Sequence, residues 1–209
     1  IADQGIVLYN KRQTEYFQLM LRTYMDELRQ IRKMTNLYST MGWKEKNTAF
    51  VLGNTLIRKD DKGVAIEEQI NLASVVNRQG SELYNPKGDI EQWTSLTNVL
   101  EKGGLYAHMF VLGVGFSAPL YNFTGLKGLT VSLYGPTGGG KTLAQYWAQS
   151  IYGNPDKLHF AAKYTQNSLF TRLGTYANLP LTIDEVTMMN DKEVGDFCYW
   201  VSQGRDKAR

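Results

Sequence analysis

The chain has 209 residues, a formal net charge of +3, and hydrophobic and charged fractions of 43% and 21%. These fractions are ordinary for a soluble globular protein, and so small a positive charge does not by itself indicate a nucleic-acid partner. The single cysteine, Cys198, excludes an intramolecular disulfide and suits a reducing, cytoplasmic compartment. No cluster of cysteines and histidines has the spacing of a structural zinc site.

The first predicted element is a long amphipathic helix over residues 11–37. Apolar side chains recur there at helical spacing, and basic side chains are interleaved with them. Three roles fit such a helix. It packs on its own domain, which we favour, it mediates contacts between subunits, or it lays its basic face on nucleic acid.

A small antiparallel β unit is expected next. β-favouring runs at 49–53 and 55–59 precede the turn signal Asp-Asp-Lys-Gly at 60–63, and a returning strand is expected at 64–66. Asp89 then predicts the N-cap of a further helix. We place a domain boundary near residue 102, which gives regions 1–102 and 103–209.

The segment 105–123 is apolar over the length of a membrane span. It contains His108, two glycines, a proline and an asparagine, which argue against a span. We therefore expect a buried helix over 105–118 and no membrane partner, with His108 as a hydrogen-bonded core or edge residue.

The octapeptide GPTGGGKT at 135–142 fits the phosphate-binding pattern G-x-x-x-x-G-K-[ST]. Its glycines let backbone N–H groups point toward a phosphate, Lys141 would reach the β- and γ-phosphates, and the Thr142 hydroxyl would bind Mg²⁺. A strand is predicted before the loop at 129–134 and a helix after it at 143–152. The residues expected to bind ATP are Gly135, Pro136, Thr137, Gly138, Gly139, Gly140, Lys141 and Thr142.

A second motif for the same nucleotide is LPLTIDE at 179–185, a short apolar strand that ends in two carboxylates. Asp184 would lie beside Mg²⁺, and Glu185 would be the base that activates the attacking water. Glu185 and Lys141 are therefore the expected catalytic residues. The adjacent glutamate favours hydrolysis of ATP over phosphoryl transfer by a kinase.

Between these motifs we expect a second strand at 157–162, and polar residues follow it. Thr165 and Asn167 would lie near Glu185 and could act as a switch that holds the glutamate in or out of position, although an ordinary loop is the simpler reading. After the acids, Asn190 and Glu193 form a capping-box pattern at the start of an amphipathic helix.

Together these elements predict an α/β fold, a P-loop NTPase of RecA- or AAA+-like type with a parallel sheet, preceded by a smaller helical and β region. Three strands are placed, at 129–134, 157–162 and 179–184. Because the chain begins with Ile1 and ends after a basic run, we expect a fragment of a longer protein. The sensor strand and any arginine finger are expected after Arg209.

The ordered motifs resemble a P-loop family catalogued as a domain of unknown function. The resemblance is carried by GW at 42–43, AFVLG at 49–53, FSAPL at 116–120, LYGPTGGGKT at 133–142, QSIYG at 149–153, the Thr165-x-Asn167-Ser168 turn, LTIDE at 181–185 and SQGRDKAR at 202–209. The family is found in phage, plasmid and mobile-element genes, is often joined to a primase or primase-polymerase, and is described as helicase-like. A phage-encoded member would work in the host cytoplasm.

The resemblance implies an ATP-driven motor on single-stranded DNA that works as a homo-oligomeric ring, similar to superfamily 3 or AAA+ helicases. By that analogy Arg205, Lys207 and Arg209 would touch DNA phosphates, and a solvated chain end is the alternative. We favour a replicative helicase ATPase. A nucleotide-gated assembly or loader ATPase without unwinding is the second hypothesis, and a nucleotide kinase is a third.

Overall fold

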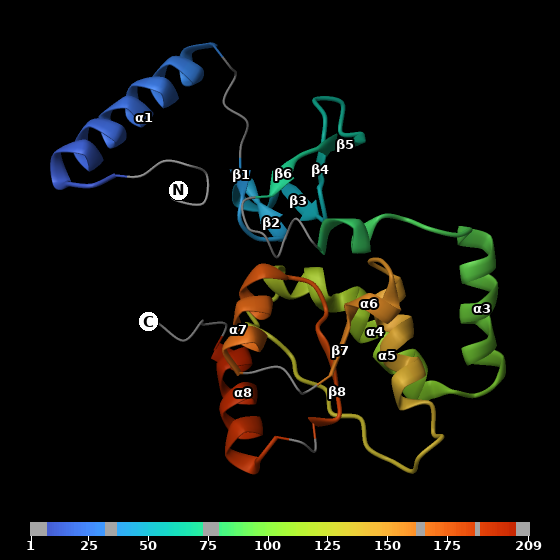
Figure 1. Ribbon diagram of the computed structural model, residues 1–209. Coiled ribbons are helices and arrows are strands. Elements are labelled where there is room, and N and C mark those ends of the chain that lie inside the picture. Colours follow the sequence, from blue (N-terminus) through green and yellow to red (C-terminus); the bar gives the residue numbers. More distant parts are fainter. Residues whose placement is uncertain (1–7, 32–36, 73–79, 162–165, 187–188, 204–209) are drawn as a thin grey trace. The chain divides into compact units, whose positions relative to one another are not determined.

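The computed structural model describes residues 8–31, 37–72, 80–161, 166–186 and 189–203, and the chain divides into two units, residues 1–36 and 37–209. The described part of the first unit contains the helix α1 (Lys11–Ile31) (Figure 1). The helix predicted over 11–37 is therefore confirmed for most of its length. Which of its three expected roles it fulfils stays a prediction.

The second unit begins with mostly β elements and continues with mostly helical ones; η denotes a 3-10 helix. The first group comprises β1 (Leu37–Tyr38), β2 (Gly42–Lys44), η2 (Glu45–Asn47), β3 (Ala49–Leu52), β4 (Thr55–Lys59), β5 (Ala65–Gln69), β6 (Asn71–Leu72) and η3 (Ser81–Tyr84). The second group comprises α3 (Ile90–Lys102), α4 (Tyr106–Ser117), η4 (Ala118–Phe123), α5 (Lys141–Ser150), α6 (Pro155–Leu158), β7 (His159–Ala161), α7 (Gln166–Thr175), β8 (Thr182–Asp184) and α8 (Asp191–Gln203).

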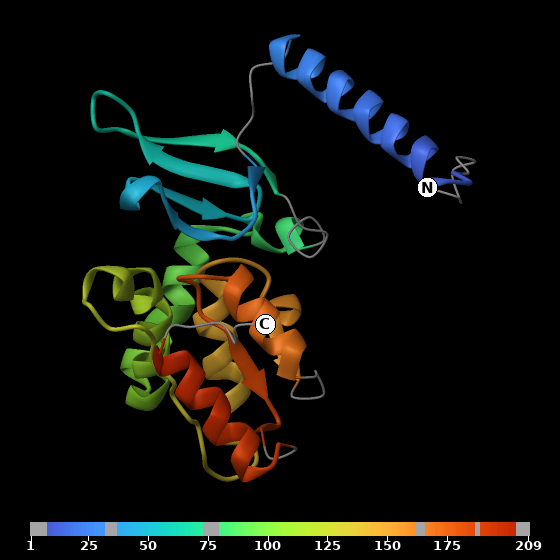
Figure 2. The same cartoon turned by 90° about the vertical axis from the view of Figure 1, so that its left-hand side faces the viewer.

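The predicted antiparallel β unit is confirmed as a four-stranded sheet in the order β2-β3-β4-β5 (Figure 2). The turn between β4 and β5 forms because Asp60 accepts hydrogen bonds at Oδ1 from the backbone N–H groups of Lys62 and Val64, at 2.9 and 2.8 Å. The short strands β1 and β6 make a separate parallel pair.

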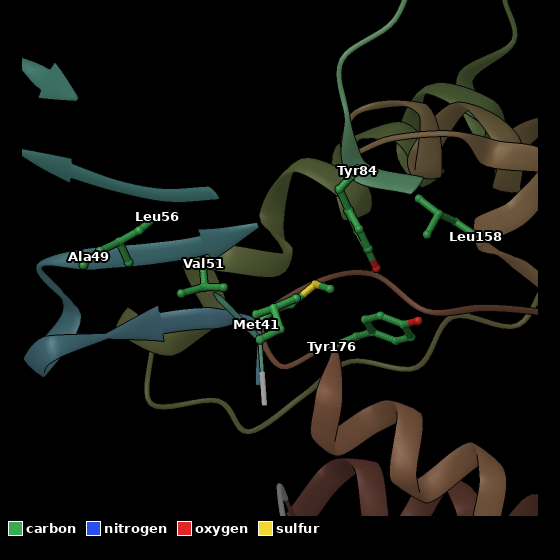
Figure 3. Close-up of a cluster of buried hydrophobic side chains, with 8 residues drawn as sticks. Met41, Ala49, Val51, Leu56, Tyr84, Leu158 and Tyr176 are labelled. Carbon is green, nitrogen blue, oxygen red and sulfur yellow. The ribbon is translucent and has the colours of Figure 1, made fainter. Parts of the chain in front are cut away.

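One hydrophobic cluster joins the antiparallel sheet to later parts of the second unit. Val51 and Leu56 contribute from the sheet and Met41 from the residue before β2, and they pack with a group that includes Leu158 and Tyr176 (Figure 3). The backbone N–H of Met41 donates to the carbonyl oxygen of Thr175 at 2.8 Å. The cluster thus has members on both sides of residue 102, and the predicted division into 1–102 and 103–209 stays a prediction.

Gly42 makes this junction possible. Its φ is +83°, and a Cβ atom at this position would lie 2.1 Å from the carbonyl oxygen of Ala177. Only glycine combines that backbone conformation with so close an approach. The neighbouring Trp43 fixes the junction further, because its backbone N–H donates to Asn178 Oδ1 at 3.2 Å and its Nε1 donates to the Pro119 carbonyl oxygen at 2.8 Å.

The helix expected over 105–118 is present as α4, which packs against α5. The prediction that it is buried holds for one face only: Val111 and Leu112 are buried, whereas Tyr106 and Phe110 are exposed. Small residues bring the two helices together, since a Cβ atom on Gly115 would lie 3.1 Å from the Ala148 Cβ. No helix among the described residues is both long and apolar enough to cross a membrane.

The predicted parallel sheet of three strands is wrong. Residues 129–134 form no strand, and Leu129 and Tyr134 are 47% and 95% exposed. The other two predicted strands are present only as β7 and β8, which pair in parallel, His159 with Thr182 and Ala161 with Asp184. β-favouring residues supply propensity alone, and a strand forms only where a neighbour completes its hydrogen-bond ladder.

The architecture is therefore a mixed α/β fold with a four-stranded antiparallel sheet and a two-stranded parallel sheet at β7 and β8, not a RecA- or AAA+-like parallel sheet. Helix α5 contacts both β7 and β8, and α7 lies beside α8 (Figure 1), where the rings of Phe170 and Phe197 are 6.3 Å apart. This arrangement places the glycine-rich loop, which precedes α5, and the acidic residues, which end β8, on neighbouring elements.

Candidate functional site

The glycine-rich loop leads directly into α5, as the sequence predicts. Gly135, Gly138 and Gly140 have φ values of +145°, +82° and +76°, in the left-handed range that favours glycine. The Gly139 N–H donates to the Pro136 carbonyl oxygen at 3.2 Å, which tightens the turn. The N-terminal N–H groups of an α-helix have no partner within the helix, so the start of α5 at Lys141 offers donors to an anion.

The Lys141 side chain folds back over this loop. Its Nζ donates to the carbonyl oxygens of Gly135 and Pro136, at 2.9 and 2.8 Å. A phosphate oxygen at the same place would accept a stronger, charge-assisted hydrogen bond. The Thr142 side chain is exposed, and its hydroxyl makes no hydrogen bond within the described part of the chain. The phosphate-binding role of Lys141 and the Mg²⁺-binding role of Thr142 stay predictions.

His108 lies against the end of the loop, which the sequence did not indicate. Its Nε2 atom lies 2.5 Å from the position that a Cβ atom on Gly140 would take. The side chain is half-buried and makes no hydrogen bond with any residue the structure describes, so the expected hydrogen-bonded role is not the one observed. His108 thus brings an imidazole from α4 to the first turn of α5.

The direction of β8 relative to α5 follows from two glutamine side chains on α5. Gln149 Nε2 donates to the Pro180 carbonyl oxygen at 3.1 Å and to Thr182 Oγ1 at 3.2 Å. One turn earlier on the helix, Gln145 Nε2 donates to the carbonyl oxygen of Ile183 at 3.4 Å. As β8 advances from residue 180 to 183, it therefore moves toward the N-terminus of α5, where the glycine-rich loop lies.

The two acidic residues end this strand. Asp184 is half-buried and Glu185 is exposed. Asp184 Oδ1 accepts a hydrogen bond from the Glu185 N–H at 2.9 Å, which holds the carboxylate on the turn. Glu185 has a φ of +56°, an unfavourable conformation for a residue with a side chain. Residues held in this way cluster at functional sites, because the surrounding structure must compensate for the strain.

His159 on β7 is a second neighbour of the site that the sequence did not indicate. Its Nε2 atom lies 2.5 Å from Gln145 Oε1, and its ring stacks edge-on against Tyr146 at 5.1 Å. Since Gln145 Nε2 donates to Ile183, its Oε1 is an acceptor and His159 Nε2 carries the hydrogen. Burial lowers the pKa of His159 below its ordinary value, and the nearby Asp184 carboxylate partly opposes that shift.

The remaining predicted site residues are not tested by the structure. Thr165, Arg205, Lys207 and Arg209 lie outside the described residues. Asn167 lies in the first turn of α7, but its side chain is not among those that the structure describes. The predicted switch on Glu185 and the predicted DNA contacts therefore stay predictions.

The site has residues of the kinds that would hold a magnesium–triphosphate group. The described residues include no cluster of three or more histidine, cysteine or acidic side chains that could hold a metal ion. Mg²⁺ does not require one, because in nucleotide sites it is commonly bound by one or two protein oxygens together with substrate phosphates and water. The Thr142 hydroxyl and the Asp184 carboxylate are the oxygen groups that would supply such ligands.

Comparison with known proteins identifies the family but adds no named relative. A search of curated proteins and a search of solved structures each found no significant match. The model of the family described as a domain of unknown function, DUF927, matches residues 2–209, and the chain therefore belongs to this family.

Proposed function

We propose that the chain binds ATP with Mg²⁺ through the loop at 135–142, and that the complete protein hydrolyses ATP with Glu185 as the base. The observation that carries the proposal is the direction of β8. The strand runs toward the N-terminus of α5, so the acidic residues at its end approach the phosphate-binding loop at the start of that helix. Two motifs about 40 residues apart in sequence are thereby brought to neighbouring elements.

Each residue has a distinct part in this proposal. The loop N–H groups and the Lys141 ammonium hold the phosphates, and Lys141 exchanges its bonds to the Gly135 and Pro136 carbonyl oxygens for bonds to phosphate. Thr142 and Asp184 hold Mg²⁺, which neutralises phosphate charge when bound. Glu185 orients a water molecule and accepts its proton.

The proposed biological role is that of a motor for DNA replication. The sequence resembles phage and mobile-element proteins described as helicases, and membership of DUF927 is consistent with that resemblance. We expect single-stranded DNA as the partner, a homo-oligomeric ring as the active assembly, and a primase or polymerase domain in the same polypeptide. This role rests on the resemblance, whereas nucleotide binding rests on the geometry.

Two substitutions in the complete protein test the site. Lys141→Ala removes the main cationic partner of the phosphates, and we expect it to abolish tight ATP binding. Glu185→Gln removes the base but keeps the size of the side chain, and we expect normal binding and at least a hundredfold loss of hydrolysis, on the order of a general-base contribution. Lys157→Ala, at an exposed lysine on α6, is the matched control and should change neither quantity.

The role on DNA is tested by measuring ATP hydrolysis with and without single-stranded DNA. The helicase proposal predicts stimulation by single strands and unwinding of a forked duplex. Hydrolysis that is indifferent to DNA would refute that role, and normal hydrolysis by Glu185→Gln would refute the assignment of the base.

A further inference from the structure

We propose that Gln145 and Gln149 are positioning residues that hold the acidic end of β8 at the start of α5. This proposal rests on the proposed function, because it concerns the spacing between the two halves of that same site. The phosphate-binding residues belong to α5 and its loop, whereas Asp184 and Glu185 end a different element. Their spacing therefore depends on whatever joins α5 to β8.

Gln149 is the more deeply buried of the two glutamines. It is 2% exposed, and its amide N–H groups donate to the Pro180 carbonyl oxygen and to Thr182 Oγ1. A buried amide is retained only where its hydrogen bonds are made, because an unpaired one loses its water without replacement. Both of these partners belong to β8 or to the residues that lead into it.

Gln145 ties three elements together. It donates from Nε2 to the Ile183 carbonyl oxygen at 3.4 Å and accepts at Oε1 from His159 Nε2 at 2.5 Å. Ile183 is the residue immediately before Asp184, so the hydrogen bond from Gln145 to Ile183 lies one peptide unit from the proposed metal ligand. His159 anchors the same amide to β7, which fixes the orientation of the glutamine.

Hydrogen bonds from two helix residues four positions apart constrain β8 more than hydrogen bonds from one residue can. Residues at i and i+4 lie on the same helix face, separated by about 6 Å along the helix axis. Attachment at both points sets the position of β8 along α5 and also its direction. A shift of β8 by one residue would exchange the side chains that face α5, and it would break both glutamine contacts together.

The positioning role predicts that turnover and binding respond differently to substitution. In the full protein, Gln145→Met and Gln149→Met keep the length of the side chain and lose the amide. We expect the Kd for ATP, measured without Mg²⁺, to stay within about threefold of the wild type, because the loop and Lys141 hold the phosphates and Asp184 acts only through the metal. We expect kcat to fall about tenfold to a hundredfold, the effect of displacing a catalytic group by about 1 Å.

Leu56→Ala is the matched control, because Leu56 is 4% exposed in the antiparallel sheet and its truncation lowers stability without removing a hydrogen bond to β8. It should leave both kcat and Kd unchanged at a temperature where the protein is folded. Gln145→Met provides the measurement if Gln149→Met does not fold, because Gln145 is only half-buried.

The outcomes separate the two proposals. If the wild type hydrolyses ATP, Lys141→Ala fails to bind it, and folded glutamine variants keep the wild-type kcat, then the positioning role alone is overturned. It is also overturned if kcat and Kd worsen in parallel, or if Leu56→Ala loses kcat to the same extent. If the wild type neither binds nor hydrolyses ATP, the proposed function fails and the positioning role fails with it.

Discussion

Alanine substitutions at two loop glycines separate backbone strain from the contact with His108. Gly138 and Gly140 have nearly equal φ values, +82° and +76°. A Cβ atom on Gly138 would meet nothing within 4 Å, whereas one on Gly140 would lie 2.5 Å from His108 Nε2. Both alanines force a side chain into the left-handed region, which costs about 1–2 kcal/mol. Gly140→Ala must in addition move the imidazole.

The extra cost at Gly140 is set by how readily His108 can turn away. The imidazole is the far end of a half-buried side chain, so rotation relieves the overlap, and an off-rotamer side chain costs about 0.5–1.5 kcal/mol. We therefore expect Gly138→Ala to lower the free energy of unfolding by about 1–2 kcal/mol and Gly140→Ala to lower it by about 1.5–3.5 kcal/mol.

Urea denaturation measures both changes, provided that the slope of the transition stays constant between variants. The variant His108→Ala, alone and combined with Gly140→Ala, completes a double-mutant cycle. We expect a coupling of about 0.5–1.5 kcal/mol, because removal of the imidazole leaves only the strain in the backbone. Equal destabilisation by the two alanines, or additive effects in the cycle, would refute the contact between α4 and the loop.

Three further predictions concern the rest of the second unit. Gly42→Ala should destabilise the protein by at least about 2 kcal/mol more than Gly63→Ala. Both glycines have a positive φ, but of the two only Gly42 would bring a Cβ atom against a backbone oxygen, at 2.1 Å. Equal destabilisation of the two variants in thermal or urea unfolding would contradict this prediction. Burial lowers the pKa of His159, so as pH falls through the ordinary value of 6.5 the unfolded state binds the proton before the folded state does. The free energy of unfolding should therefore fall between pH 6.5 and the lowered pKa. The variant His159→Gln should lack this part of the pH dependence, and identical stability profiles for the variant and the wild type would disprove the shift. Glu185→Gly should abolish hydrolysis while raising the free energy of unfolding by up to about 1 kcal/mol, since it releases a strained φ, and a clear loss of stability would count against strain at this turn.

Local signals in the sequence predicted local structure well. Asp89 caps α3 by accepting from the Gln92 N–H at 2.9 Å, and Asn190 and Glu193 make both bonds of the capping box, each at 2.9 Å. Each of these contacts joins residues within four positions of one another. The information needed to form them is therefore contained in a short stretch of sequence.

Pairings between distant segments were not predictable in the same way. The segment 129–134 has the composition of a strand, yet whether it pairs depends on a neighbour that its own residues do not specify. The buried face of α5 is likewise set by its neighbours. The apolar Leu143 is 52% exposed, whereas Ala148 and Gln149 are 3% and 2% exposed. Small residues let α4 approach closely, and a polar side chain is buried where β8 supplies its partners.

The turn at Asp184 and Glu185 shows why adjacent acids require an unusual backbone to serve one site. Successive side chains in an extended strand point to opposite faces, so two neighbouring carboxylates on β8 would diverge. The φ of +56° at Glu185 breaks that alternation at the residue where it matters. The hydrogen bond from the Glu185 N–H to Asp184 Oδ1 occupies one carboxylate oxygen and leaves the other available for a metal ion or its water. In the proposed mechanism both acids would act on one triphosphate, and such a break in the alternation is what would let both carboxylates face it.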